Sequence, residues 1–250
     1  MALTDLKSVE LDLARLAANG ILTPQAPRSR LADEYRAAKR GLLVNLRNES
    51  AAPVKRANCI MVTSSVPGEG KTFTALNLAM SLAMEMDTSV LLVDADVMRP
   101  SVMTRLGLPS DKGLLDLLED PGLALSDVVL RTNVDKLLLL SAGSASGRAT
   151  ELLASGAMAR LIEDLAAQDA SRILLFDAPP LLAVPETRAL AAHVGQIVVV
   201  VEAQRTLQST LTEALDLIKE CPVVMTLLNK TRGLSAGRNA YGYGYGYGAP

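Results

Sequence analysis

Six short, continuously apolar runs follow one another from residue 59 onward: CIMVT, SVLLVDAD, KLLLLSAG, RILLFDAPP, QIVVVVEA and PVVMTLLN. They are rich in β-branched and aliphatic residues, and they do not alternate with polar positions. This pattern is typical of strands buried on both faces of a parallel sheet. Helical patterns separate the runs at 71–86, 149–168, 183–193 and 206–219. Strands and helices in alternation predict an α/β fold with a doubly wound, mostly parallel sheet flanked by helices.

The chain before the first run has a different pattern. Residues 3–18 space apolar side chains among charged ones, which predicts an amphipathic helix. A glycine and two prolines then break the pattern. A second helix is predicted over 29–47, with Ser29 as its cap. The predicted organisation is an N-terminal helix and linker over 1–28, an α/β domain over 29–231 and a flexible tail over 232–250.

Composition and charge narrow the classes of function. About half of the 250 residues are hydrophobic, which is enough for a core, and the formal net charge of −2 argues against a general nucleic-acid binder. We see no signal peptide and no apolar run near the ~20 residues that a membrane-spanning helix needs, so we expect a cytoplasmic protein. Cys59 and Cys221 are expected to be buried thiols, and the single histidine, His193, to be structural.

A phosphate-binding loop is predicted where the first run ends. Residues 65–72 read SVPGEGKT, which fits such a loop except that Ser65 replaces its first glycine. Glycines let the backbone turn its amides toward phosphates, and the following helix adds positive potential. Lys71 would reach the β- and γ-phosphates, and the Thr72 hydroxyl would bind Mg²⁺. The predicted nucleotide-binding residues here are Val66, Pro67, Gly68, Glu69, Gly70, Lys71, Thr72 and Phe73.

Three aspartates follow apolar runs at the edge of the sheet where α/β proteins bind ligands. Asp94 and Asp96 close the second run, and Asp177 lies at the end of the apolar part of the fourth. Buried carboxylates need a cation or hydrogen-bond donors, and Mg²⁺ beside a triphosphate supplies one. We predict that Asp94 and Asp177 organise Mg²⁺ together with Thr72, so ATP and Mg²⁺ are the expected cofactors. The alternative is that individual aspartates cap loops.

The chain ends in YGYGYGYGAP. Four of its five tyrosines lie here, each followed by glycine: Tyr241, Tyr243, Tyr245 and Tyr247. Glycine spacers work against burying these rings in a packed core. The tail is either a low-complexity segment or a segment presented to another site, and its own sequence leaves both interpretations open.

Together, SSVPGEGKT, LLVDADVMRP, LLFDAPP and the tyrosine cluster resemble, in that order, the bacterial tyrosine kinases of capsule and exopolysaccharide systems. The resemblance covers about residues 29–250. It implies an ATP- and Mg²⁺-dependent kinase in which Lys71, Asp94 and Asp96 are catalytic, with one of the two aspartates activating the incoming phenol. It also implies that the tail tyrosines are phosphoacceptors and that the kinase regulates polysaccharide polymerisation and export.

The same resemblance implies partners. Members of the family assemble as a ring in which the tail of one subunit enters the next subunit's site, so phosphorylation is expected in trans. No membrane spans precede the kinase region, which resembles the stand-alone form with a separate, membrane-bound, chain-length-determinant-like activator. We therefore expect a location at the inner face of the membrane through that activator, a cognate tyrosine phosphatase and no nucleic-acid partner.

The ring-interface motif of the family, Glu-x-x-Arg-x-x-Arg, is matched here by Asp33, Arg36 and Lys39. The charge signs persist, although aspartate is shorter and lysine lacks the planar fork of arginine. We take these residues as the expected oligomer interface, with a solvated helix face as the alternative. Asn229, after the last run, is the expected adenine contact, and a turn-forming asparagine is the alternative.

Two other functions are compatible with a phosphate loop. One is a ParA/MinD-like ATPase without kinase activity. That group carries a signature lysine at the second place of the loop, where this chain has Val66. The other is a non-enzymatic adaptor, which the intact Lys71, Thr72, Asp94 and Asp177 argue against.

Overall fold

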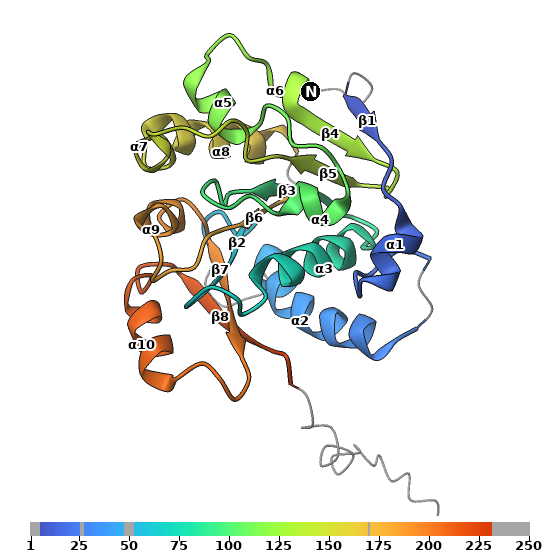
Figure 1. Ribbon diagram of the computed structural model, residues 1–250, viewed down its shortest axis with the longest axis vertical. Helices are drawn as coiled ribbons and strands as arrows, with labels where there is room; N and C mark the ends of the chain where they lie inside the picture. Colours follow the sequence, from blue (N-terminus) through green and yellow to red (C-terminus); the bar gives the residue numbers. More distant parts are fainter. Residues whose placement is uncertain (1–5, 26–27, 48–52, 170, 232–250) are drawn as a thin grey trace, which may run out of the picture.

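The structure, a computed structural model, describes residues 6–25, 28–47, 53–169 and 171–231, so the four tail tyrosines lie outside the described residues. The described chain forms one eight-stranded sheet between two layers of helices (Figure 1). Its strands are β1 (Lys7–Val9), β2 (Cys59–Ser64), β3 (Ser89–Asp94), β4 (Val129–Thr132), β5 (Leu137–Leu140), β6 (Arg172–Asp177), β7 (Gln196–Glu202) and β8 (Val223–Asn229).

The strand order is β1-β4-β5-β3-β6-β2-β7-β8. All neighbouring strands are parallel except β4 and β5. The six predicted strands are β2, β3, β5, β6, β7 and β8, so the predicted doubly wound, mostly parallel fold is confirmed. The carboxyl ends of β2, β3 and β6 lie side by side, because Val62 pairs with Asp177 and Asp94 pairs with Asp177.

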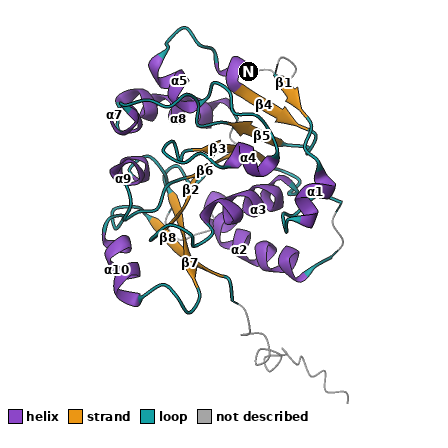
Figure 2. Cartoon of the chain, viewed as in Figure 1, coloured by secondary structure: helices purple, strands orange, loops and turns teal. Residues whose placement is uncertain are grey.

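Helices cover both faces of the sheet, as Figure 2 shows by element type. One face packs against α1 (Leu13–Ala18), α2 (Arg30–Leu46), α3 (Lys71–Ala83) and α4 (Val102–Leu106). The other packs against α5 (Leu114–Glu119), α6 (Leu125–Val128), α7 (Ala149–Leu153), α8 (Gly156–Gln168), α9 (Pro185–Ala191) and α10 (Gln208–Asp216). None of the helices in the described part of the chain is long and apolar enough to cross a membrane.

The prediction of a single helix over residues 3–18 is wrong. The described part of this segment forms the edge strand β1 and the short helix α1. Its leucines serve opposite faces of the sheet, since Leu6 packs into one core cluster and Leu11 into the other. Asp12 caps the N-terminus of α1 by accepting a hydrogen bond from the backbone N–H of Arg15 at 2.9 Å, so the helix begins only after it.

The predicted helix over 149–168 is present in two pieces, α7 and α8. Ser155 separates them, and its hydroxyl accepts a hydrogen bond from the backbone N–H of Met158 at 3.3 Å. Serine at this position starts a new helix because it satisfies an N–H that has no partner within the helix. The predicted helices at 29–47, 71–86, 183–193 and 206–219 correspond to α2, α3, α9 and α10.

Candidate functional site

The loop between β2 and α3 has the backbone of a phosphate-binding loop. Gly68 and Gly70 have φ values of +93° and +101°, which side chains rarely adopt, and α3 begins directly after them at Lys71. A Cβ built on Gly70 would lie 2.1 Å from Nδ2 of Asn229, so glycine is required there for space as well as for conformation.

Glu69, in the middle of this loop, is buried, and its carboxylate bonds within the protein. Its Oε2 accepts from the backbone N–H of Val66 at 2.9 Å, and its Oε1 accepts from the Thr206 hydroxyl. The side chain of Asn229 donates to the carbonyl of Glu69 at 2.8 Å, and Lys230 Nζ donates to the carbonyl of Gly68 at 2.7 Å. The loop is thus fastened to residues that follow β7 and to the end of β8.

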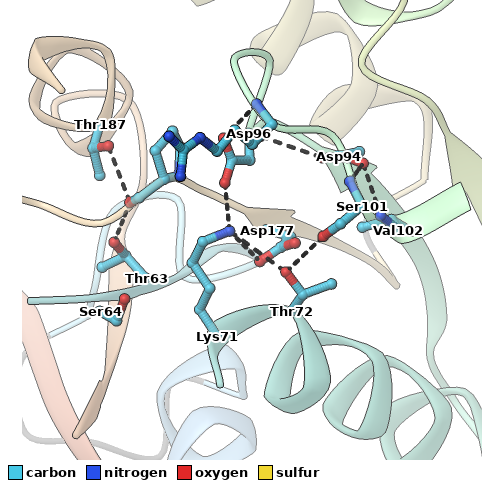
Figure 3. Close-up of polar contacts among 12 residues, drawn as sticks. Thr63, Ser64, Lys71, Thr72, Asp94, Asp96, Ser101, Val102, Asp177 and Thr187 are labelled. Carbon is cyan, nitrogen blue, oxygen red and sulfur yellow. Dashed lines mark hydrogen bonds and ion pairs between the residues drawn. The ribbon is translucent and has the colours of Figure 1, made fainter. Parts of the chain in front are cut away.

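Lys71 lies among the three predicted aspartates and contacts two of them (Figure 3). Its Nζ is 2.6 Å from Asp96 Oδ2 and 3.7 Å from Asp177 Oδ1, and it lies 3.4 Å from the Thr72 hydroxyl. Only 13% of the Lys71 side chain and 8% of the Asp96 side chain are exposed. A cation and two carboxylates therefore share a largely buried site at the carboxyl edge of the sheet.

Asp94 is fully buried and holds the loop that follows β3. Its Oδ2 accepts from the backbone N–H groups of Ser101 and Val102 at 3.0 and 2.9 Å, and its Oδ1 accepts from that of Asp96 at 3.3 Å (Figure 3). Burial, reinforced by the charge of Asp177, raises the pKa of Asp94 to about 7. Through these amides Asp94 places the Ser101 hydroxyl 3.1 Å from that of Thr72.

Asp177 is buried, and neither of its carboxylate oxygens has a hydrogen-bond partner among the described residues. Burial raises the pKa of its carboxyl to about 6, against the opposing effect of the nearby Lys71 charge. Carboxylate oxygens that lack a hydrogen bond and lie near the Thr72 hydroxyl are the kind of oxygen donors that Mg²⁺ prefers. The described residues contain no cluster of three or more His, Cys, Asp or Glu residues that would cage a metal. Mg²⁺ bound with a nucleotide needs only one or two carboxylates, so these residues fit it.

A cavity of about 460 Å³ opens beside these groups. Its lining includes most of the predicted nucleotide-binding residues, Pro67, Gly68, Gly70, Lys71, Thr72 and Phe73, together with Asp96, Ser101 and Arg105. Asn229 donates to the Glu69 carbonyl of the loop and is not among the residues that line the cavity, so its assignment as an adenine contact stays a prediction. A larger cavity of about 860 Å³ lies near Arg56 and Cys221, and its lining contains no residue of the phosphate loop.

The three predicted interface residues lie on α2 but differ in exposure. Asp33 and Arg36 are exposed and pair with each other. Lys39 is buried, and its Nζ lies 2.7 Å from Glu85 Oε1 and 2.6 Å from the Ser81 carbonyl, which it can reach because α2 packs on α3. Lys39 is thus engaged within its own subunit, which leaves Asp33 and Arg36 as the exposed members of the motif.

Known proteins resemble this chain over most of its length. Residues 57–229 match the family model for the AAA domain. The tyrosine-protein kinase YwqD of Bacillus subtilis is 30% identical over 202 residues, which are 80% of this chain and 81% of YwqD. The succinoglycan biosynthesis transport protein ExoP of Rhizobium meliloti is 34% identical over 214 residues, 82% of this chain but only 26% of ExoP.

A solved structure agrees with these relatives. The kinase domain of VpsO superposes with a TM-score of 0.68 at 30% sequence identity, covering 80% of this chain and 93% of that domain. The parallel sheet, the phosphate loop with Lys71 among the aspartates and these similarities lead to one conclusion. The chain belongs to the bacterial tyrosine-protein kinase (BY-kinase) family.

Proposed function

We propose that this protein is an ATP-dependent protein-tyrosine kinase whose main acceptors are the tyrosines of its own C-terminal cluster. The observation that carries the proposal is the position of Lys71, at the end of the phosphate loop, beside the carboxylates of Asp96 and Asp177. A cation in this position can exchange a carboxylate partner for the phosphates of ATP. The name of YwqD, a tyrosine-protein kinase, supports protein tyrosine as the acceptor, and that of the VpsO domain supports a kinase.

In the proposed reaction, the phenol oxygen of an acceptor tyrosine attacks the γ-phosphorus of ATP. The bond from that phosphorus to the bridging β–γ oxygen breaks, and ADP leaves. Lys71 and the loop amides hold the phosphates in line with the incoming oxygen. Thr72 and Asp177 would hold Mg²⁺ through their oxygens, and the ion would neutralise charge on the phosphates.

We assign the acceptance of the phenol proton to Asp96. Its side chain lines the cavity, and its Oδ2 becomes free when Lys71 turns toward the phosphates. The three backbone amides on Asp94 give that residue a different part, which is to position the segment from Asp96 to Val102. In this proposal Asp96 acts on the phenol and Asp94 positions the loop, whereas the sequence alone could not say which aspartate activates the phenol.

We further propose the assembly that the family membership implies. Subunits form a ring, each tail is phosphorylated by the neighbouring subunit, and Asp33 and Arg36 contribute to the contact. A separate, membrane-bound activator of the chain-length-determinant type recruits the kinase to the inner face of the membrane, and a cognate phosphatase reverses the modification. The proposed output is control of capsule or exopolysaccharide polymerisation and export, in line with the polysaccharide named in ExoP.

Incubation of the full chain with Mg²⁺ and ATP labelled on its γ-phosphate tests the proposal, with and without co-expression of a membrane protein of the chain-length-determinant type. We expect phosphotyrosine, and none from Lys71→Met. Lys112→Met is the matched control, because Lys112 is exposed and is not among the residues that line the cavity. Release of phosphate without phosphotyrosine would identify a ParA/MinD-like ATPase instead, and the absence of both would favour a non-enzymatic adaptor.

A further inference from the structure

The cavity beside Lys71 has walls of two kinds. Lys71, Thr72, Asp96 and Ser101 line it with charged and hydroxyl groups. The same cavity is also lined by apolar residues from two loops, Met98, Pro179, Pro180, Ala183 and Val184, and by Arg99 and Arg105. Phosphates need the polar groups, whereas the apolar residues offer nothing to a phosphate or a metal ion. This apolar wall can therefore hold an apolar ligand group close to the transferring phosphate.

The apolar wall is held rigidly at its base. The carbonyl of Pro179 accepts hydrogen bonds from the hydroxyls of Thr63 at 2.6 Å and Thr187 at 3.0 Å (Figure 3). The backbone N–H of Leu181 donates to the carbonyl of Ser64 at 2.8 Å. These bonds tie the segment after β6 to the end of β2, from which the phosphate loop starts. The wall and the phosphate loop therefore keep a fixed relation to each other.

Met98 provides the exposed part of the wall. Its side chain is 58% exposed, although the preceding residue, Val97, is buried. The loop that carries it is pinned on both sides, because Asp94 accepts from the N–H of Asp96 and Asp96 accepts from the N–H of Arg99 at 3.1 Å. An exposed thioether held two residues from a cavity-lining carboxylate is suited to contact an aromatic ring.

We propose that Met98, Ala183 and Val184, backed by Pro179 and Pro180, form the subsite that binds the phenyl ring of the acceptor tyrosine. The inference rests on the proposed kinase function and names the substrate class of that site. A ring in this subsite directs its hydroxyl toward Asp96 and the γ-phosphate. Serine and threonine have no ring to fill the subsite, so it selects tyrosine. Small neighbours such as glycine let the acceptor backbone approach the rim closely.

The test uses the full chain with all four tail tyrosines changed to phenylalanine, so that a synthetic peptide of residues 241–250 is the acceptor. Peptide phosphorylation is measured with Mg²⁺ and ATP, and KM is determined separately for peptide and for ATP. Met98→Ala and Val184→Ala should each raise KM for the peptide by about tenfold, since each removes apolar contact with the ring. KM for ATP should change by less than about twofold, because neither substitution removes a group that is proposed to bind the nucleotide.

Two further variants separate the subsite from general effects. Met98→Leu keeps an apolar side chain of similar volume and should restore KM for the peptide. Met86→Ala removes a methionine that is 88% exposed elsewhere and should leave both KM values unchanged. An unchanged peptide KM in both alanine variants, or a parallel rise in KM for ATP, would overturn the subsite while leaving the kinase function intact. Absence of peptide phosphorylation by the parent chain would overturn both.

Discussion

The side-chain amide of Asn229 occupies the space that a side chain on Gly70 would need. Its Nδ2 donates to the carbonyl of Glu69 at 2.8 Å and lies 2.1 Å from the point where a Cβ on Gly70 would stand. The end of β8 and the phosphate loop are therefore fitted to each other, and a change on either side must disturb the other.

Gly70→Ala should weaken ATP binding by tenfold or more. The new methyl group meets Asn229, and the left-handed backbone at φ +101° costs an L-residue about 1–2 kcal/mol, which alone is about tenfold. Titration with a fluorescent ATP analogue measures the effect. Gly147→Ala is the control, because nothing lies within 4 Å of a Cβ there and it should bind as the parent does. Equal affinity of the two variants would show that the fit at Gly70 is unimportant for the nucleotide.

Asp177→Asn should stabilise the metal-free protein while reducing kinase activity. The folded-state pKa of Asp177 is raised to about 6, so the folded state binds more protons than the unfolded chain between about pH 4 and pH 6. The stability that protonated Asp177 contributes to the folded state is therefore fully present below about pH 4, and it is lost as pH rises through about 6. Removing the charge should add up to about 3 kcal/mol above that pH and little below pH 4.

Urea unfolding in EDTA at pH 4.5 and 7.5 measures this difference. Asp94, whose pKa is raised to about 7, should keep part of the pH dependence in the variant. Asp135 is exposed, so Asp135→Asn serves as the control and should unfold at the same urea concentration as the parent at both pH values. If the asparagine variant were less stable at pH 7.5, Asp177 would be held by interactions that outweigh its burial.

Substitutions at Lys39 and Arg36 should have different effects: the first should lower the stability of the subunit, and the second should weaken its assembly. Lys39→Ala removes a buried ion-pair partner of Glu85 and the donor to Ser81, and it should lower the free energy of unfolding by about 2 kcal/mol. Arg36→Ala should change stability by less than about 0.5 kcal/mol, since its pair with Asp33 is exposed. If Arg36 contributes to the ring, the Arg36→Ala substitution should lower the mass of the assembly measured by light scattering. The reverse pattern would mean that Lys39, not Arg36, reaches a neighbour.

The tail tyrosines should be phosphorylated redundantly. Adjacent ones are two residues apart, at most about 7 Å of extended chain, so a small slide exchanges one hydroxyl for the next. No single change among Tyr241, Tyr243, Tyr245 and Tyr247 to phenylalanine should silence the signal, whereas all four together should. The fifth tyrosine, Tyr35, is buried in α2, and burial raises its pKa to about 12, so it is a poor acceptor. Mass spectrometry that found most phosphate on Tyr35 would contradict this assignment.

Transfer between subunits has its own test. A chain with Lys71→Met and an intact tail is mixed with an active chain that lacks residues 239–250. Neither can label its own tail, so phosphotyrosine on the Lys71→Met chain must come from the other. Silence in the mixture, with the parent chain active alongside, would exclude transfer in trans.

Six of the eight described strands followed from continuous apolar runs, because burial on both faces leaves an unmistakable pattern. The single helix predicted over 3–18 was wrong because the apolar residues of this segment pack on two opposite faces of the sheet. Their spacing therefore resembles that of a helix. The strand β4 is as short as β5, but its sequence VLRT ends in Arg131 and Thr132, so no continuous apolar run marks it.

The motif predicted which residues of the site come together but not how they are fastened. Nothing in the sequence marks Glu69 as a buried carboxylate bound by Thr206, because that contact joins residues far apart in the chain. The same holds for Lys39, whose burial depends on how α2 packs on α3. Asp94 and Asp96 stand two residues apart in one motif, and the structure distinguishes them. Backbone amides hold Asp94, whereas Asp96 contacts Lys71 and lines the cavity.

The position of β2 inside the sheet, between β6 and β7, has a consequence for how the chain folds during synthesis. Its two neighbours, β6 and β7, lie more than a hundred residues further along, with Cys59 beside Leu174 and Ile60 beside Gln196. Pairings this distant form slowly and leave apolar strands exposed while they wait. The predicted phosphate-binding loop is therefore encoded in the first third of the chain, yet we expect it to take shape only after the last strands have left the ribosome.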